Sequence, residues 1–340
     1  MSLLWSSKRL TVVSPSQPVL LVALLGFDPG ETLALESQFA ECTALSAQWR
    51  VGAPERADLW IVNGRTVAVG EDETLATEGL RFRPEEARRP VAFAEPVPAM
   101  LDARFRFDFH APESLAAMLA ALAPWLSPRV VQQALIGHLI ANAAHFTRST
   151  VIHVEEHGRL LAVVNFSGDT GVATDATPAA IRRADWLLRP PSAGFVPSIF
   201  HAAPTEEVLW RFATRAEGVD VLPARYRRLP IYLRRAPRLP PEELTPDQAA
   251  IVDEIADECR TWRQLSARLG CTDRELRRDL GALYLVGAIT CDPSRSLTTS
   301  PGLLAPRHAV AAEPSTNGSS AFAGAPLLAP AATGEAARLP

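Results

Sequence analysis

The feature that most constrains the fold is an alternation of short apolar runs with amphipathic stretches over the first 126 residues. Runs of this length, separated by helical patterns and turn residues, predict an α/β layer fold. The predicted strands are residues 19–25, 47–51, 58–63, 90–95 and 105–110. Helical spacing over residues 31–40 and again after Pro112 predicts helices that cover this sheet.

Length and composition indicate more than one domain. A chain of 340 residues corresponds to two or three domains, and 47% hydrophobic with 21% charged residues excludes global disorder. The predicted organisation is a multidomain α/β and α+β protein. Its parts are a leader (1–17), an α/β domain (18–126), a connecting helix (127–147), a mixed α+β module (148–240), a three-helix module (241–293) and a disordered tail (294–340).

The connecting helix carries an apolar stripe. Ser127 and Pro128 have the character of an N-cap and a first helical residue, and Val131, Leu135 and Leu139 recur at helical spacing. The stripe either packs inside its own chain or, if it is exposed, buries itself across a two-fold axis. We therefore expect a homodimer in the second case.

The mixed module begins with a predicted β-hairpin. Residues 150–155 and 159–166 flank a turn at 156–158, where Gly158 supplies conformational freedom. Further predictions are a helix from Thr177 through Leu188, a strand over 195–200, and a helix capped by Thr205.

The order of the first five strands resembles the receiver domain of bacterial response regulators, a flavodoxin-like parallel sheet. The resemblance implies acidic residues after strand one, a phosphate-accepting aspartate after strand three and a lysine after strand five. At these positions the chain has Asp28 next to Phe27, Asn63, and His110. An amide is no phosphate acceptor. The resemblance therefore implies a phosphorylation-incompetent domain used for protein docking.

The C-terminal pattern resembles a winged helix-turn-helix module. Predicted helices begin after Thr245, Thr261 and Thr272, a Gly270 turn separates the last two, and a short strand follows at 287–289. The resemblance implies that Arg274, Arg277 and Arg278 on the third helix face DNA. Asp273 and Asp279, expected on the same outward face, nearly cancel their charge, so a winged helix that contacts protein is the alternative.

A basic segment at residues 225–238 lies just before this module. Arg234 and Arg235 would add DNA phosphate contacts; alternatively, the segment is a solvated connector whose arginines meet Glu206 and Glu207. Spacings around Arg182 and Arg234 also resemble cyclic dinucleotide sites, but arginine is abundant in this chain and such spacings arise by chance.

Several functional classes find no support. The four cysteines lack a C-x-x-C pair, the histidines lack a recognised ligand spacing, and no phosphate-cradling loop or nucleophile elbow occurs. We therefore expect no enzyme, no metal and no cofactor. The apolar run from residue 19 to 27 is too short to span a membrane and lacks a cleavage site, which favours a buried strand in a cytoplasmic protein over a signal peptide.

These patterns together predict a cytoplasmic bacterial regulator that controls transcription through DNA binding, with further protein partners at the receiver-like domain. The competing prediction is an adaptor in a signalling or motility pathway that binds proteins and not DNA. A response of this adaptor to a cyclic dinucleotide is part of the same alternative.

Overall fold

The computed structural model describes residues 17–297, with the exception of 43, 71–73, 78–79, 84–86, 88, 100, 102, 143–149, 217 and 241–242. The predicted leader lies outside the described residues apart from residue 17, and so does the predicted tail beyond residue 297. The chain up to Ser300 forms one compact unit.

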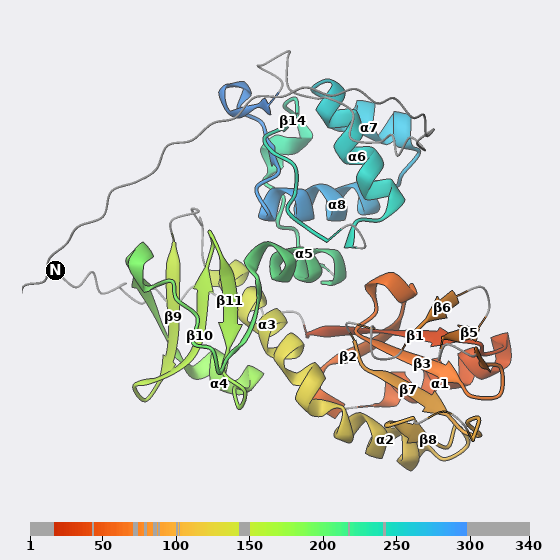
Figure 1. Ribbon diagram of the computed structural model, residues 1–340. Coiled ribbons are helices and arrows are strands. Elements are labelled where there is room, and N and C mark those ends of the chain that lie inside the picture. Colours follow the sequence, from red (N-terminus) through yellow and green to blue (C-terminus); the bar gives the residue numbers. More distant parts are fainter. Residues whose placement is uncertain are drawn as a thin grey trace, which may run out of the picture. The chain divides into compact units, whose positions relative to one another are not determined.

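A five-stranded, entirely parallel sheet organises the N-terminal part (Figure 1). All five predicted strands are present, and the last is the shortest. The spatial order is β2 (Gln48–Val51), β1 (Val19–Leu25), β3 (Leu59–Asn63), β7 (Val91–Ala94) and β8 (Arg106–Phe107). The central strands are apolar on both sides because both faces of the sheet are covered.

Different structures cover the two faces. On one face, helices α1 (Pro29–Glu41) and α2 (Pro112–Ala121) pack on Leu20, Ile61 and their neighbours. On the other, Leu75 from a small antiparallel sheet packs on residues that include Val62. That sheet is built from β4 (Ala68–Val69), β5 (Leu75–Thr77) and β6 (Leu80–Phe82). In α1 the buried residues are Leu35 and Phe39, while Leu33 is 68% exposed.

Helix α3 (Ala123–Asn142) links the two halves of the fold. It begins four residues earlier than predicted, and Pro128 lies inside it rather than at its first turn. Of the two alternatives for the apolar stripe, packing inside its own chain is confirmed, because Val131, Leu135 and Leu139 are at most 4% exposed and belong to the core. This stripe therefore cannot form a dimer interface in the folded chain.

No single helix among the described residues is long and apolar enough to cross a membrane. Helices α2 and α3 meet the combined requirement of length and apolar composition only together, and they are bent by 76° relative to each other.

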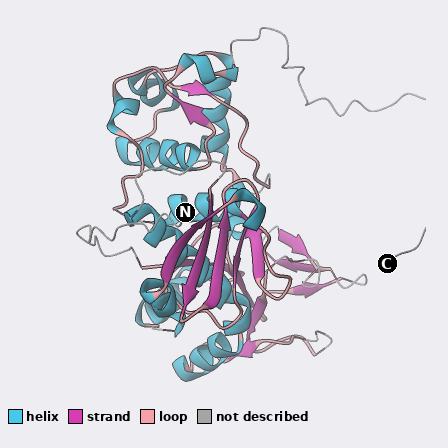
Figure 2. Ribbon diagram, turned by 90° about the vertical axis from the view of Figure 1, so that its left-hand side faces the viewer, coloured by secondary structure: helices cyan, strands magenta, loops and turns pink. Residues whose placement is uncertain are grey.

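A second, antiparallel sheet follows α3 (Figure 2). Its order is β12 (Asp185–Arg189), β9 (Val151–Glu156), β10 (Arg159–Asn165), β11 (Asp169–Val172) and β13 (His201–Pro204). The predicted hairpin is β9–β10, and its turn residues His157 and Gly158 both have positive φ, as a tight hairpin turn requires. Helices α4 (Pro178–Arg183) and α5 (Thr205–Arg215) contribute, with α3, to the core on one face.

Three predictions in this module are wrong. Thr205 is the first residue of α5 rather than its cap, and its hydroxyl donates to the carbonyl oxygen of Asn165 at 2.8 Å. The helix from Thr177 ends at Arg183, and residues up to Arg189 form the edge strand β12 instead, because they pair with β9. Residues 195–200 form no strand. They belong to a loop that crosses the sheet, in which the backbone carbonyls of Ala193 and Gly194 contact His153 and Asn165 at 2.9 and 3.2 Å.

The C-terminal part contains three helices and a two-stranded sheet. They are α6 (Pro246–Asp257), α7 (Trp262–Leu269), α8 (Asp273–Leu285), β14 (Tyr232–Leu233) and β15 (Ile289–Thr290). Each helix begins with the predicted threonine, and in each case a capping box satisfies the first backbone N–H groups. Their buried residues join those of the antiparallel sheet in one continuous core.

Candidate functional site

The first predicted site lies at the carboxyl edge of the parallel sheet. Asp28 caps α1 and accepts a hydrogen bond from the backbone N–H of Glu31 at 2.8 Å. The amide of Asn63, at the end of β3, donates to the carboxylate of Glu31 at 3.1 Å. The structure thus brings Asp28 and Asn63 together through Glu31, and the arrangement fastens β3 to the start of α1.

The surroundings of this edge are aromatic. Phe27, beside Asp28, is 8% exposed, and its ring lies 6.3 Å from that of Phe109. His110 is exposed, packs edge-on against Phe109, and donates its backbone N–H to Asp108. An aromatic ring thus lies where the receiver resemblance expects a second acidic side chain, and an amide lies where it expects the acceptor.

The arginines of α8 lie at its N-terminal half. Arg274 and Arg278 are exposed, whereas Arg277 forms ion pairs with Asp273 at 3.2 Å and Asp220 at 3.5 Å. The expectation that Asp279 faces outward is wrong. It is 3% exposed, accepts a hydrogen bond from Gln248 at 2.8 Å, and pairs with Arg278 at 3.1 Å.

The outer face of α8 is covered within the chain. Residues 274, 277, 278 and 281 share one helical face. At position 281 the helix approaches Val221 so closely that a Cβ on Gly281 would lie 3.0 Å from its Cγ2. Helix α8 also packs along α5 (Figure 1). One part of this face is therefore an intramolecular contact.

The two arginines predicted as phosphate contacts in the basic segment have different surroundings. Arg235 forms an ion pair with Glu206 at 2.5 Å and donates to the carbonyl oxygen of Val286. Arg234 is exposed beside the end of β14. The structure therefore pairs Arg235 with Glu206, one of the two acids proposed as its neighbours, and leaves Arg234 at the surface.

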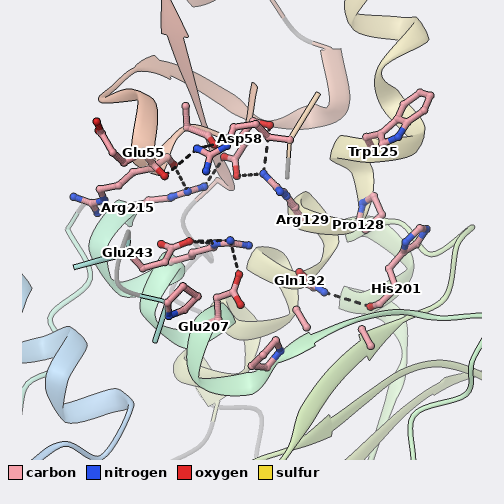
Figure 3. A pocket seen from close by; sticks show the side chains of 18 of the residues that line it. Glu55, Asp58, Trp125, Pro128, Arg129, Gln132, His201, Glu207, Arg215 and Glu243 are labelled. Carbon is pink, nitrogen blue, oxygen red and sulfur yellow. Dashed lines mark hydrogen bonds and ion pairs between the residues drawn. The ribbon is translucent and has the colours of Figure 1, made fainter. Parts of the chain in front are cut away.

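The most strongly buried charges surround Asp58, which precedes β3 at the amino edge of the sheet. Its carboxylate lies 2.5 Å from a guanidinium nitrogen of Arg215 in α5 and 2.8 Å from one of Arg129 in α3 (Figure 3). It also accepts the backbone N–H of Leu21 at 3.0 Å. Asp58 and Arg215 are 1% and 3% exposed, so one carboxylate connects three parts of the fold.

These contacts control the ionisation of Asp58. Burial alone would raise the pKa of this carboxyl group, but the charges of Arg215 and Arg129 and the Leu21 N–H outweigh it. The pKa of Asp58 is therefore lowered below its ordinary value, and the carboxylate is charged at neutral pH.

A cavity of about 720 Å³ opens beside this cluster (Figure 3). Its walls come from the loops before β3 and β7, from α3, from β13 and from α5. A second ion-pair group on its wall joins Arg211 to Glu243 at 2.8 Å and to Glu207. The cavity has the size of a small-molecule site at a junction of structural units.

Sequence reasoning did not find this site. Asp58 is the first residue of the predicted strand 58–63, at the opposite end from Asn63, where the sequence indicates a site. Arg129 and Arg215 come from helices far along the chain, so no local spacing connects them to Asp58. The only available signal was a charged residue immediately before an apolar strand.

Comparison with protein-family models, with curated proteins and with solved structures finds no match to this chain. Within the described part of the chain, no group of three or more His, Cys, Asp or Glu side chains is placed to hold a metal ion.

Proposed function

We propose that this chain is a bacterial signalling adaptor, in which a receiver-like domain without phosphorylation chemistry and a winged-helix module act through protein contacts. The parallel strand order 2-1-3-4-5 among the five main strands supports the receiver-like assignment. The amide of Asn63 at the expected acceptor position supports the loss of phosphoryl transfer, because an amide is not a nucleophile that forms an acyl phosphate.

Three capped helices support the winged-helix assignment, together with β15, which follows them and pairs with β14, the strand that precedes them. In a DNA-binding winged helix, the N-terminal turns of the third helix enter the major groove. The observation that carries the adaptor proposal is the covered outer face of α8, where Gly281 meets Val221 and Arg277 pairs with Asp220. This contact restricts how far α8 can enter a major groove, which is about 12 Å wide.

DNA-dependent transcriptional control is the second candidate. The exposure of Arg274 and Arg278 on α8 and of Arg234 beside β14 favours it. Under this candidate, α8 separates from α5 and from residues 220–221 before it contacts DNA. Arg277 and Arg278 would then supply base or phosphate contacts, while Arg234 and Arg235 would add sequence-independent affinity.

The two candidates differ in a fluorescence anisotropy experiment with the full chain, a labelled random duplex and the protein's own upstream region, at several salt concentrations. The adaptor proposal predicts no salt-sensitive binding by the wild type. It predicts none by Gly281→Leu either, a variant whose added side chain separates α8 from Val221. Ala267→Leu, which adds the same side chain on an exposed part of α7, is the control.

Salt-sensitive binding by the wild type would overturn the adaptor proposal. Binding gained only by Gly281→Leu, with circular dichroism like that of the control, would establish DNA binding that the α8 contact holds back. Charge-removing substitutions at Arg277 and Arg278 should then weaken it.

A further inference from the structure

The cavity beside Asp58 contains more positive than negative side chains. Among the described residues, five arginines and four acidic residues line it. The arginines are Arg56, Arg89, Arg129, Arg211 and Arg215, and the acids are Glu55, Asp58, Glu207 and Glu243. Three acids already pair with three of the arginines, and the fourth, Glu55, is exposed.

Two of the lining arginines have no carboxylate partner among the described residues. The three hydrogen bonds of Arg89 all go to backbone carbonyl oxygens, those of Pro54, Glu55 and Ala57. The guanidinium of Arg56 makes no hydrogen bond or ion pair with any described residue. Neither guanidinium group therefore has a hydrogen-bonded or ion-paired carboxylate among the described residues, and the charge of Glu243 offsets theirs only in part.

The surroundings disfavour these charges. Burial lowers the pKa of Arg56, and the nearby charge of Arg215 lowers it further. Burial likewise lowers the pKa of Arg89, with Arg129 as the second cause. A partly buried cation next to other cations is destabilising unless an anion accompanies it. A ligand oxyanion beside the guanidinium group of Arg56 would reduce that cost and accept charge-assisted hydrogen bonds.

The remaining wall is apolar and partly aromatic. Trp125 is 41% exposed, and Pro124 and Pro128 flank it on α3. Residues 202–204 of β13 contribute two alanines and a proline, next to the exposed His201. Figure 3 shows Trp125 and His201 at the same end of the pocket, away from Arg215. An inorganic ion alone would leave this end of the cavity unfilled.

We propose that this cavity binds a small organic oxyanion, whose phosphate or carboxylate group accepts hydrogen bonds from Arg56 and whose planar body lies against Trp125. Phosphate and carboxylate share the chemistry that a guanidinium fork recognises, so the structure assigns the oxyanion class and the experiment separates the two sources. The volume of about 720 Å³ accommodates a ligand the size of a nucleotide. This inference does not depend on the proposed function.

Isothermal titration calorimetry on the full chain tests it with three probes. Adenosine 5′-monophosphate carries a phosphate on a planar body, benzoate carries a carboxylate on one, and adenosine has the planar body alone. We expect the monophosphate or benzoate to bind at least tenfold more tightly than adenosine, and the tighter of the two identifies the source. If neither oxyanion binds at millimolar concentration, or if adenosine binds equally well, the proposal is wrong.

Variants locate the binding. Arg56→Gln should weaken the better probe by about tenfold or more, since a hydrogen bond to a charged group contributes roughly 1.5 to 3 kcal/mol. Because no described residue pairs with Arg56, this variant should fold normally. Trp125→Ala should weaken binding as well. Arg183→Gln, which removes a 65% exposed arginine distant in the fold, is the control and should leave affinity unchanged. An unchanged affinity in Arg56→Gln would exclude the cavity as the site.

Discussion

Replacing Asp58 with asparagine removes one buried negative charge while it preserves the shape of the side chain. In the wild type this carboxylate lies 2.5 Å from Arg215 and 2.8 Å from Arg129, and it accepts the N–H of Leu21. The variant leaves Arg215, which is 3% exposed, as a buried cation without its counter-ion. An asparagine NH₂ group would also point a donor at one of the two guanidinium groups.

The structure sets the size of the effect. Breaking a buried ion pair by removing one partner costs about 3 to 5 kcal/mol, because the remaining charge is left uncompensated. The free energy of unfolding of a natural domain is roughly 5 to 15 kcal/mol, so this loss is a large fraction of the total. Since Asp58 connects the parallel sheet to both α3 and α5, we expect the loss in the unfolding of the whole described fold.

Urea denaturation at pH 7, followed by tryptophan fluorescence, measures the loss. The control is Asp175→Asn, which breaks the surface pair of Arg159 and Asp175, where both side chains are more than half exposed. That pair should contribute less than about 1 kcal/mol. A double variant, Asp58→Asn with Arg215→Met, should be more stable than Asp58→Asn alone, since it removes the orphaned charge. A loss in Asp58→Asn no larger than in the control would refute the reasoning.

Three further predictions concern other parts of the fold. Because the pKa of Asp58 is lower in the folded state, the charged carboxylate stabilises the fold at pH values above its unfolded pKa of about 3.9. This stabilisation is lost as the pH falls through the folded pKa, so the acid dependence of the unfolding free energy should contain a component that Asp58→Asn lacks. Leu135→Glu should unfold the chain rather than yield a soluble monomer, at a cost above ~3 kcal/mol, because Leu135 is 0% exposed. The control Leu33→Glu, at a 68% exposed position, should change the free energy of unfolding by less than ~0.5 kcal/mol. A folded, soluble Leu135→Glu protein would contradict the buried position of Leu135. In Gly171→Ala, the new Cβ would lie 2.1 Å from Val196, so the loop over the sheet should shift. Chymotrypsin should then cleave this variant faster than the wild type at the exposed Phe195. An unchanged cleavage rate would show that the loop does not pack against Gly171.

The secondary structure that could be predicted from sequence is the part governed by local chemistry. The five strands of the parallel sheet coincide with apolar runs, because a strand buried on both faces must be apolar along its length. The three C-terminal helices begin at Thr245, Thr261 and Thr272, because a threonine and a Glu or Gln three residues later satisfy the first N–H groups locally.

The errors arose where pairing with distant residues decided the outcome. Residues 185–189 have a helical pattern but form a strand, because β9 offers an edge with which they pair. Pro128 lies in the first turns of α3 rather than at its start, because the helix extends back to Ala123, where it follows α2 after a sharp bend. Periodicity alone also did not distinguish a buried apolar stripe on α3 from an exposed one.

The sequence by itself determined the five strands of the parallel sheet and the three capped C-terminal helices, because each depends on residues close together in the chain. Only the tertiary structure decided that Asp58, Arg129 and Arg215 share one buried cluster, and that Arg56 and Arg89 line a cavity without a carboxylate partner among the described residues. The physical reason is that a charge has no preferred sequence spacing. Whether an arginine is solvated, paired or left without an anion depends on which distant elements pack around it.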